Sequence, residues 1–121
     1  KDIYISEEKL NELSHSIEKF FKEKRPYTDP DFSLNKLASQ LNTNITYVSR
    51  ALKHCKNVGF KTYLNSYRIA DIKERLNKQE HKKYTLKHLY SSVGFTHQTT
   101  FNRVFKEVEG ITPTEYIERL G

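Results

Sequence analysis

An internal repeat limits the folds open to this chain more than any other feature of its sequence. Apolar and basic residues recur in the same order in the two copies. The counterparts, first copy then second, are Leu34 and Leu86, Leu37 and Leu89, Leu41 and Val93, Val48 and Phe101, Arg50 and Arg103, Leu52 and Phe105, and Lys53 and Lys106. Because a repeated pattern of this kind marks one supersecondary unit used twice, we expect two similar units.

Each copy is expected to form two helices joined by a short turn. The apolar spacing predicts helices over about 34–41, 45–56, 86–92 and 98–109. Asn44 and Thr85 are suited to cap helices, and Gly94 is suited to the second turn. Asn57 and Gly110 follow the later helix of each copy, and both residue types tolerate the left-handed conformation that closes a helix. Helix, short turn, helix is the pattern of the DNA-reading helix-turn-helix.

Two further helices are expected outside these pairs. Ser6 is followed by two glutamates, as at a helix start, and apolar residues with helical spacing continue to about Lys24. The prolines in the next segment, residues 25–31, indicate a turn-rich connector. Between the copies, apolar residues from Thr62 to Asn77 have helical spacing, which predicts a long linker helix spanning roughly 20–25 Å.

The sequence therefore predicts an all-α fold of two helix-turn-helix subdomains joined by a long linker helix, with an additional N-terminal helix. The expected parts are the N-terminal helix and connector (1–31), the first helix-turn-helix (32–61), the linker helix (62–80) and the second helix-turn-helix (81–121). A chain of 121 residues can bury a core but is short for an enzyme that must also build a deep pocket.

Acidic residues are excluded from most of both copies. Segments 32–70 and 81–106 contain no Asp or Glu, although the chain has 15 of them, and both segments carry Lys and Arg. Carboxylates repel a polyanion as lysines attract it, so their exclusion creates two positive surfaces in a chain of net charge +6. Nucleic acid is the partner that this pattern favours.

Polar side chains share one face of the second helix in each copy, because positions i, i+3, i+4 and i+7 of a helix lie on the same side. Arg suits guanine, Asn and Gln suit adenine, Ser and Thr suit several bases, and lysines suit phosphates. We expect base contacts from Thr46, Ser49, Arg50, Gln98, Thr99, Asn102 and Arg103. We expect phosphate contacts from Lys53, Lys56 and Lys106.

The alternative for Arg50 and Arg103 is an intramolecular salt bridge. No acid lies within a helical turn N-terminal of either arginine, so we favour a DNA contact. Arg68, in the linker helix close to Asp71, is expected to be structural. On the sides opposite the polar faces we expect buried residues. Cys55 is expected to be buried, and Val108 is expected to face inward or lie near the boundary.

No arrangement of residues suggests catalysis or metal binding. The five histidines and the single cysteine lack metal-ligand spacing, and the four glycines are too sparse for a phosphate-binding loop. We therefore expect no catalytic residue, no metal, no cofactor and no enzymatic activity. The lone cysteine and the absence of a membrane-length apolar run indicate a cytoplasmic protein with no membrane contact by this segment. Because the chain contains no methionine, we expect it to be cut from a longer protein.

The second copy also contains an ordered set of short motifs. They are Val93-Gly94-Phe95, Phe101-Asn102-Arg103-Val104-Phe105-Lys106, Gly110-Ile111-Thr112-Pro113 and Tyr116. In this order and spacing the chain, from Leu34 to about Leu120, resembles the C-terminal DNA-binding domain of the bacterial AraC/XylS-type transcriptional regulators. The resemblance implies sequence-specific binding of double-stranded DNA, with two recognition helices in successive major-groove segments. It also implies recruitment of RNA polymerase, and we expect a sensing domain upstream of this chain.

A protein-interaction module is the alternative function. In that case the repeat docks an acidic partner, and the N-terminal helix dimerises through the apolar face that contains Leu10, Leu13, Ile17 and Phe20. Salt dependence distinguishes the two functions, because DNA binding falls steeply between low and moderate salt.

Overall fold

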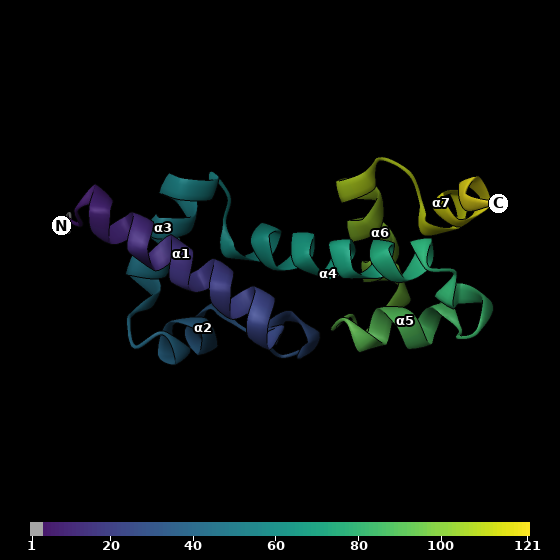
Figure 1. The fold of residues 1–121 in the computed structure, drawn as a ribbon, viewed down its shortest axis with the longest axis horizontal. Coiled ribbons are helices and arrows are strands. Elements are labelled where there is room, and N and C mark those ends of the chain that lie inside the picture. The colour runs from purple at the N-terminus through teal and green to yellow at the C-terminus, as the bar shows by residue number, and fades with distance from the viewer. Residues whose placement is uncertain (1–3) are drawn as a thin grey trace. The chain divides into compact units, whose positions relative to one another are not determined.

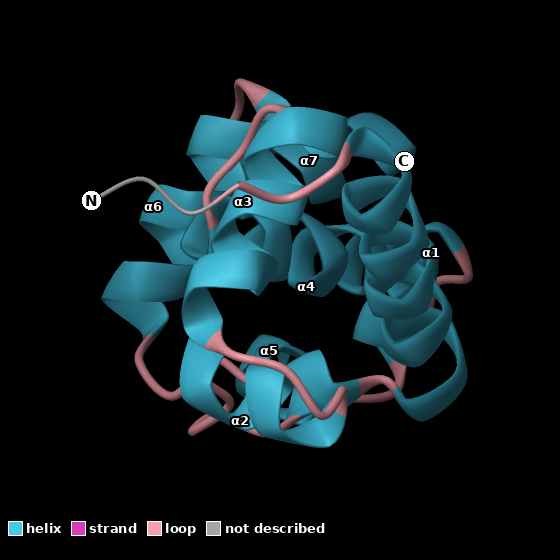
Figure 2. Ribbon diagram, turned by 90° about the vertical axis from the view of Figure 1, so that its left-hand side faces the viewer, coloured by secondary structure: helices cyan, strands magenta, loops and turns pink. Residues whose placement is uncertain are grey.

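The computed structural model describes residues 4–121, and the regular structure within this range is entirely helical (Figure 2). Its α-helices are α1 (Glu7–Lys24), α2 (Leu34–Gln40), α3 (Ile45–Lys56), α4 (Phe60–Asn77), α5 (Leu86–Ser92), α6 (Gln98–Glu109) and α7 (Pro113–Leu120). Two short 3-10 helices, η1 (Pro26–Thr28) and η2 (Glu80–Lys82), lie in connecting segments. The predicted all-α fold is confirmed.

Side-chain caps fix most of the helix starts. The Ser6 hydroxyl accepts a hydrogen bond from the backbone N–H of Lys9 at 3.1 Å, and Asn44 Oδ1 accepts one from Tyr47 at 2.9 Å. Such bonds satisfy backbone donors that have no partner within the helix. The expected cap at Thr85 is also present. These helices therefore begin where the sequence predicts.

Left-handed residues end the second helix of each helix-turn-helix. Asn57 has φ 57° and Gly110 has φ 85°, and each donates its backbone N–H to a carbonyl in the last turn. The two residues occupy equivalent positions in the repeat. An asparagine in the first copy and a glycine in the second therefore end the equivalent helix in the same left-handed conformation.

Two helices differ from the sequence expectation. The linker helix α4 begins at Phe60 rather than near Thr62, since the Tyr63 N–H already bonds to the Gly59 carbonyl at 3.1 Å. Helix α7 was not expected, although it starts with a capping box between Thr112 and Glu115. Proline at its first position is also a helix-start signal, so the sequence did contain the information.

The chain folds into two compact units. Unit 1 consists of the chain up to Pro26 together with Phe32–Tyr63, and unit 2 consists of Tyr27–Asp31 together with Leu64–Gly121. The boundary between the units therefore falls inside α4, and Tyr27–Asp31, the larger part of the connector between α1 and α2, belongs to unit 2.

In unit 1, α3 packs against both α1 and α2 (Figure 1). The buried apolar residues of this unit are Leu10, Ile17, Phe21, Leu37, Ala38, Val48, Ala51, Leu52 and Tyr63. The ring of Phe21 stands edge-on to Tyr63, with ring centroids 4.9 Å apart. This is a preferred geometry for aromatic pairs, and it fixes α1 against the start of α4.

Unit 2 has its own hydrophobic core. Its buried residues are Ile69, Ile72, Leu76, Leu89, Tyr90, Val93, Phe95, Phe101, Val104 and Phe105. Tyr90 stacks on Phe101 with centroids 5.0 Å apart, and Phe105 stands edge-on to Tyr116 at 5.5 Å. The second contact attaches α7 to α6.

Arg68 ties the connector into unit 2. Its side chain is only 6% exposed, and it donates from Nε to the Tyr27 carbonyl at 2.8 Å and from Nη2 to the Asp29 carbonyl at 3.0 Å. Its guanidinium also lies 5.5 Å from the centre of the Phe95 ring. Burial lowers the pKa of Arg68 and nearby Asp29 opposes that shift. The expectation that Arg68 is structural is confirmed.

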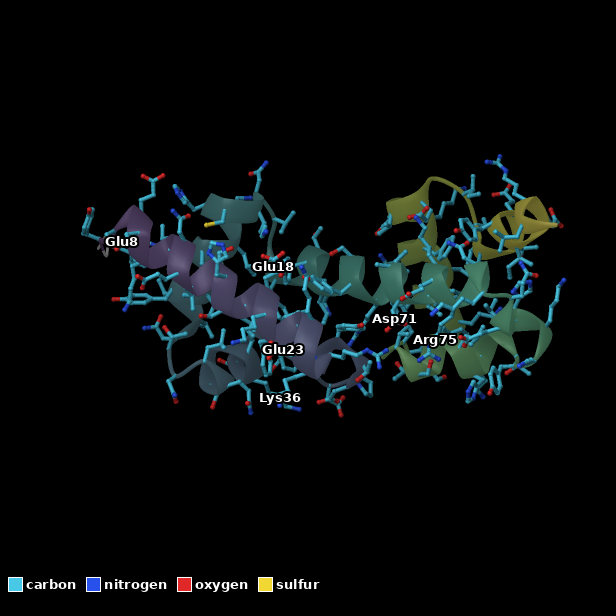
Figure 3. All side chains as sticks on the ribbon, in the orientation of Figure 1. Glu8, Glu18, Glu23, Lys36, Asp71 and Arg75 are labelled. Atoms are coloured by element: carbon cyan, nitrogen blue, oxygen red, sulfur yellow. The ribbon has the colours of Figure 1, made fainter. Side chains whose placement is uncertain are left out.

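Asp71 links the same connector to α5. Its carboxylate accepts a hydrogen bond from the Tyr27 hydroxyl at 2.8 Å and another from Arg75 Nε at 3.3 Å. Figure 3 labels Asp71 and Arg75 on α4. Arg75 in turn donates to the Ser92 hydroxyl at 2.8 Å. These side chains hold the connector, α4 and α5 together.

The repeat extends beyond the two predicted helices of each copy. In unit 1 Glu18 of α1 lies 3.8 Å from Lys56 at the end of α3. In unit 2 Lys73 of α4 lies 3.0 Å from Glu109 at the end of α6. Lys56 and Glu109 are equivalent positions, so α1 and the later part of α4 have the same role, with the charges of the pair exchanged.

Candidate nucleic-acid interface

Helix α3 has a buried apolar side and an acid-free exposed side. Val48, Ala51 and Leu52 are at most 1% exposed and face the core of unit 1. The predicted contact residues Ser49, Lys53 and Lys56 are exposed, whereas Thr46 and Arg50 are half-buried. Because no Asp or Glu occurs in α3, its outer side is positive or neutral along the whole helix.

Helix α6 has a similar buried apolar side in unit 2, but its exposed side includes Glu107. Its inner side is formed by Phe101, Val104 and Phe105, which are at most 1% exposed. The five predicted contact residues on this helix are all exposed; they are Gln98, Thr99, Asn102, Arg103 and Lys106. The helix-turn-helix geometry thus presents amide, hydroxyl and cationic groups together on one side, the groups that hydrogen-bond to base edges and phosphates.

Arg103 forms an intramolecular salt bridge, the alternative that the sequence argument ranked below a DNA contact. Its Nη1 lies 3.3 Å from Glu107 Oε2, one turn later in α6. The sequence argument considered only acids N-terminal of Arg103 and so missed this one. Both side chains are 61% exposed, and an exposed pair of this kind is worth only about 0–1 kcal/mol. Arg103 can therefore exchange this partner for DNA at low cost.

Lys56, one of the three predicted phosphate contacts, lies beside α1. Its Nζ is 3.8 Å from Glu18, which also pairs with Lys22 at 3.3 Å. The hydrogen bond from Lys22 and then the charge of Lys56 lower the pKa of Glu18. Lys56 thus forms an ion pair between α3 and α1 in addition to its contribution to the positive charge of α3.

Cys55 and Val108 occupy equivalent positions in the repeat and are less buried than expected. The Cys55 thiol is half-buried and donates to Asn11 Oδ1 on α1 at 3.3 Å. Val108 is 46% exposed, so the expectation that it faces inward or lies near the boundary is wrong. The last turn of α6 is therefore more open than its apolar pattern suggested.

Sequence reasoning missed two exposed side chains, Ile45 and Tyr84. Ile45, the first residue of α3, is 43% exposed and is the counterpart of Gln98, which was included. Tyr84 is 48% exposed and stacks on His88 with centroids 4.7 Å apart, among the lysines at 82, 83 and 87. The acid-free segment 81–106 predicted the positive charge here, but not the exposed ring stack.

The described part of the chain holds neither a metal cluster nor a membrane span. Among residues 4–121 no group of three or more His, Cys, Asp or Glu side chains is arranged to hold a metal ion. In the same range no helix combines the length and apolar character that crossing a membrane requires.

The helix-turn-helix domain family matches residues 37–119 of this chain, from α2 to α7. The chain belongs to the AraC-type helix-turn-helix family. The resemblance in the motifs of the second copy is thereby confirmed, and DNA binding is the function that goes with this type of domain.

Curated relatives of this AraC-type domain are bacterial. It is 29% identical over 105 residues to the uncharacterized HTH-type transcriptional regulator YisR of Bacillus subtilis, covering 87% of this chain and 33% of YisR. It is 24% identical over 91 residues to the regulatory protein PocR of Salmonella typhimurium, covering 75% of this chain and 29% of PocR. The chain thus spans a third or less of the length of these relatives.

Solved structures share the fold. The C-terminal domain of the two-component response regulator yesN from Fusobacterium nucleatum has a TM-score of 0.74 and 27% identity, covering 88% of this chain and 98% of that one. The C-terminal domain of AraT, a response regulator from Geobacillus stearothermophilus, has a TM-score of 0.72 and 24% identity, covering 91% and 84%. Both are C-terminal domains, as the family resemblance implied.

Proposed function

We propose that this domain binds double-stranded DNA sequence-specifically within a bacterial transcription regulator, with α3 and α6 in successive major-groove segments. One observation carries the proposal. The two equivalent helices each bury an apolar side. On the other side, α3 carries hydroxyl and cationic groups, and α6 carries amide, hydroxyl and cationic groups. A helix fits the major groove, and these are the groups that read it.

Different residues supply specificity and affinity in this proposal. Base contacts come from the exposed Ser49, Gln98, Thr99, Asn102 and Arg103, and from the half-buried Thr46 and Arg50. The exposed lysines at 53, 56 and 106 neutralise phosphates, which positions the domain without selecting a sequence.

The rest of the protein belongs to the proposal as well. A sensing domain ahead of this chain and recruitment of RNA polymerase fit a transcription regulator, and the relatives YisR and PocR are longer than this chain. A location in the cytoplasm follows from the same role, because a bacterial regulator acts where the DNA is.

Arginine and lysine substitutions on α6 test the proposal. We expect Arg103→Ala to weaken binding to a selected duplex by about 1–3 kcal/mol and to relax preference at one base pair. Lys106→Ala should weaken all duplexes alike, because a phosphate contact carries no sequence information. Arg119→Ala, which removes an exposed arginine from α7, is the matched control and should affect selected and scrambled DNA little.

The measurement is fluorescence anisotropy on a duplex selected from a random pool and on its scrambled version. Equal losses on both duplexes for Arg103→Ala would rule out the base contact. An acidic protein partner is the remaining alternative, and the absence of duplex binding even at low salt would favour it.

A further inference from the structure

Ile45 lies at the N-terminal end of α3, the helix proposed to contact DNA bases in unit 1. It is the first residue of α3 and is 43% exposed, one of only a few large apolar side chains within residues 4–121 that are exposed to this degree. Single exposed apolar residues are common and usually need no explanation. The position of Ile45 in the repeat is what sets it apart.

Ile45 continues the exposed strip of α3 that the proposed function uses. Residues four apart lie on one side of a helix, so Ile45, Ser49 and Lys53 form a line, and all three are exposed. The equivalent line on α6 is Gln98, Asn102 and Lys106, which are also exposed. Ile45 therefore takes the position that an amide takes in the second unit.

An isoleucine at that position can recognise only an apolar group. Its side chain has no hydrogen-bond donor or acceptor, and the neighbouring cap residue Asn44 has its side-chain oxygen committed to the Tyr47 N–H at 2.9 Å. In the major groove, thymine presents the C5-methyl group as the apolar contact that other bases lack.

We propose that Ile45 is a specificity-determining residue that reads the methyl group of a thymine in the half-site of unit 1. The inference rests on the proposed function and adds a base identity to it. Gln98, with its amide, selects adenine at the equivalent place in the other half-site. The two half-sites are then unlike in sequence, and the domain has one orientation on its operator.

Replacing thymine by deoxyuridine tests this inference, because it removes the methyl group and leaves the hydrogen-bonding edge unchanged. The 121-residue chain is first used to select duplexes from a random pool, and each thymine of the selected site is then replaced singly. We expect one replacement to weaken binding about fourfold, which corresponds to about 0.8 kcal/mol for one buried methyl-sized group.

The variants Ile45→Ala, Ile45→Val and Ile45→Gln assign the effect. In Ile45→Ala the same deoxyuridine should cost nothing further, whereas Ile45→Val should keep most of the discrimination. Ile45→Gln should shift the preference at that base pair toward adenine. Val108→Ala, which trims an equally exposed apolar residue away from the strip, is the control and should leave the fourfold effect intact. Circular dichroism checks that each variant is helical.

Two negative results have different meanings. If a site is selected but no thymine is sensitive, or the sensitive thymine remains so in Ile45→Ala, the inference is overturned while sequence-specific binding stands. If no sequence is enriched at all, the proposed function itself fails, and the assignment of Ile45 fails with it.

Discussion

Gly94 packs tightly against the connector in unit 2. It has φ +110°, and a β-carbon there would overlap the Tyr27 carbonyl oxygen and lie 2.7 Å from Arg68 Nε. The same oxygen and nitrogen form the hydrogen bond that holds the connector. Only a residue without a side chain lets α5 end this close to that bond.

Gly94→Ala is therefore expected to be strongly destabilising. Backbone strain and the overlap with a buried hydrogen bond together should cost about 3 kcal/mol or more of unfolding free energy. Gly110→Ala is the matched control, because Gly110 also has positive φ but has open space around its β-position. It should cost only about 1–2 kcal/mol. Urea denaturation followed by circular dichroism gives both values, and equal losses would contradict this reading of Gly94.

Glu107 limits the positive charge of the second reading face. It is the acid that pairs with Arg103 at 3.3 Å, and it follows directly after the acid-free segment. We expect Glu107→Gln to tighten binding to selected and scrambled duplexes about two- to fivefold at low salt, since a charge that repels phosphates is removed. Anisotropy titrations measure this. Weaker binding to the selected duplex would show that the pair instead positions Arg103 productively.

At the scale of helices, local signals predicted most boundaries. Ser6, Asn44 and Thr85 cap helices through their own side chains, and Asn57 and Gly110 close helices through their backbone conformation. These signals depend on residues close in the sequence, so the helix ends can be predicted from the sequence alone.

Features that depend on distant residues were not predictable in the same way. Arg68 holds the connector through the carbonyls of Tyr27 and Asp29. Every residue has a backbone carbonyl, so the residue types do not show which carbonyls accept these hydrogen bonds. Which side chains of the reading faces are half-buried, such as Thr46 and Arg50, likewise depends on the packing of other helices. The assignment of individual residues to bases and phosphates remains a prediction.

Helix α7 starts with a capping box that makes its stability depend on pH. Glu115 Oε1 accepts hydrogen bonds from the backbone N–H of Thr112 at 2.9 Å and from its hydroxyl at 3.1 Å. Bonds to the ionised form lower the pKa of Glu115 below 4.5, its ordinary value. A lowered pKa in the folded state stabilises the fold above 4.5, and that contribution is lost as the pH falls through the folded-state value.

Thr112→Ala removes this cap. We expect a loss of about 1 kcal/mol at neutral pH and a somewhat shallower decline of the unfolding free energy in acid, because the Glu115 carboxylate loses the Thr112 hydroxyl but keeps the backbone N–H of residue 112. Thr114→Ala, an exposed threonine in the first turn of the same helix, is the control. Urea denaturation at neutral and acidic pH makes the comparison. A decline in acid as steep as that of the unsubstituted chain would rule out the Thr112 hydroxyl as one of its sources.

At the scale of the whole molecule, the long helix α4 contributes residues to both units. If both reading helices engage one duplex, binding by one unit raises the effective concentration of the other. Because α4 runs unbroken across the boundary between the units, we expect this advantage to depend on an intact α4.

Breaking α4 should separate the two binding events. In Asn65→Pro the proline removes an interior helix hydrogen bond near the unit boundary, and we expect affinity for the full selected site to fall at least tenfold toward that of one half-site. Affinity for isolated half-sites should change little, and Asn65→Ala is the control. Fluorescence anisotropy titrations with full-site and half-site duplexes measure these affinities. Equal losses on both kinds of duplex would mean that the proline damages the units themselves.

The course of the connector restricts how units can be exchanged between related proteins to make chimaeras. Because Tyr27–Asp31 belongs to unit 2 while the residues on either side belong to unit 1, no single crossover point in the chain separates the units. A chimaera joined within α4 would supply unit 2 with a foreign connector. Arg68 could still donate to a foreign connector whose backbone follows the same course, since its partners are backbone carbonyls. The hydrogen bond between Tyr27 and Asp71 joins two side chains, so it survives only if both parents carry that pair. Compatibility at these two side chains should therefore decide which shuffled regulators fold.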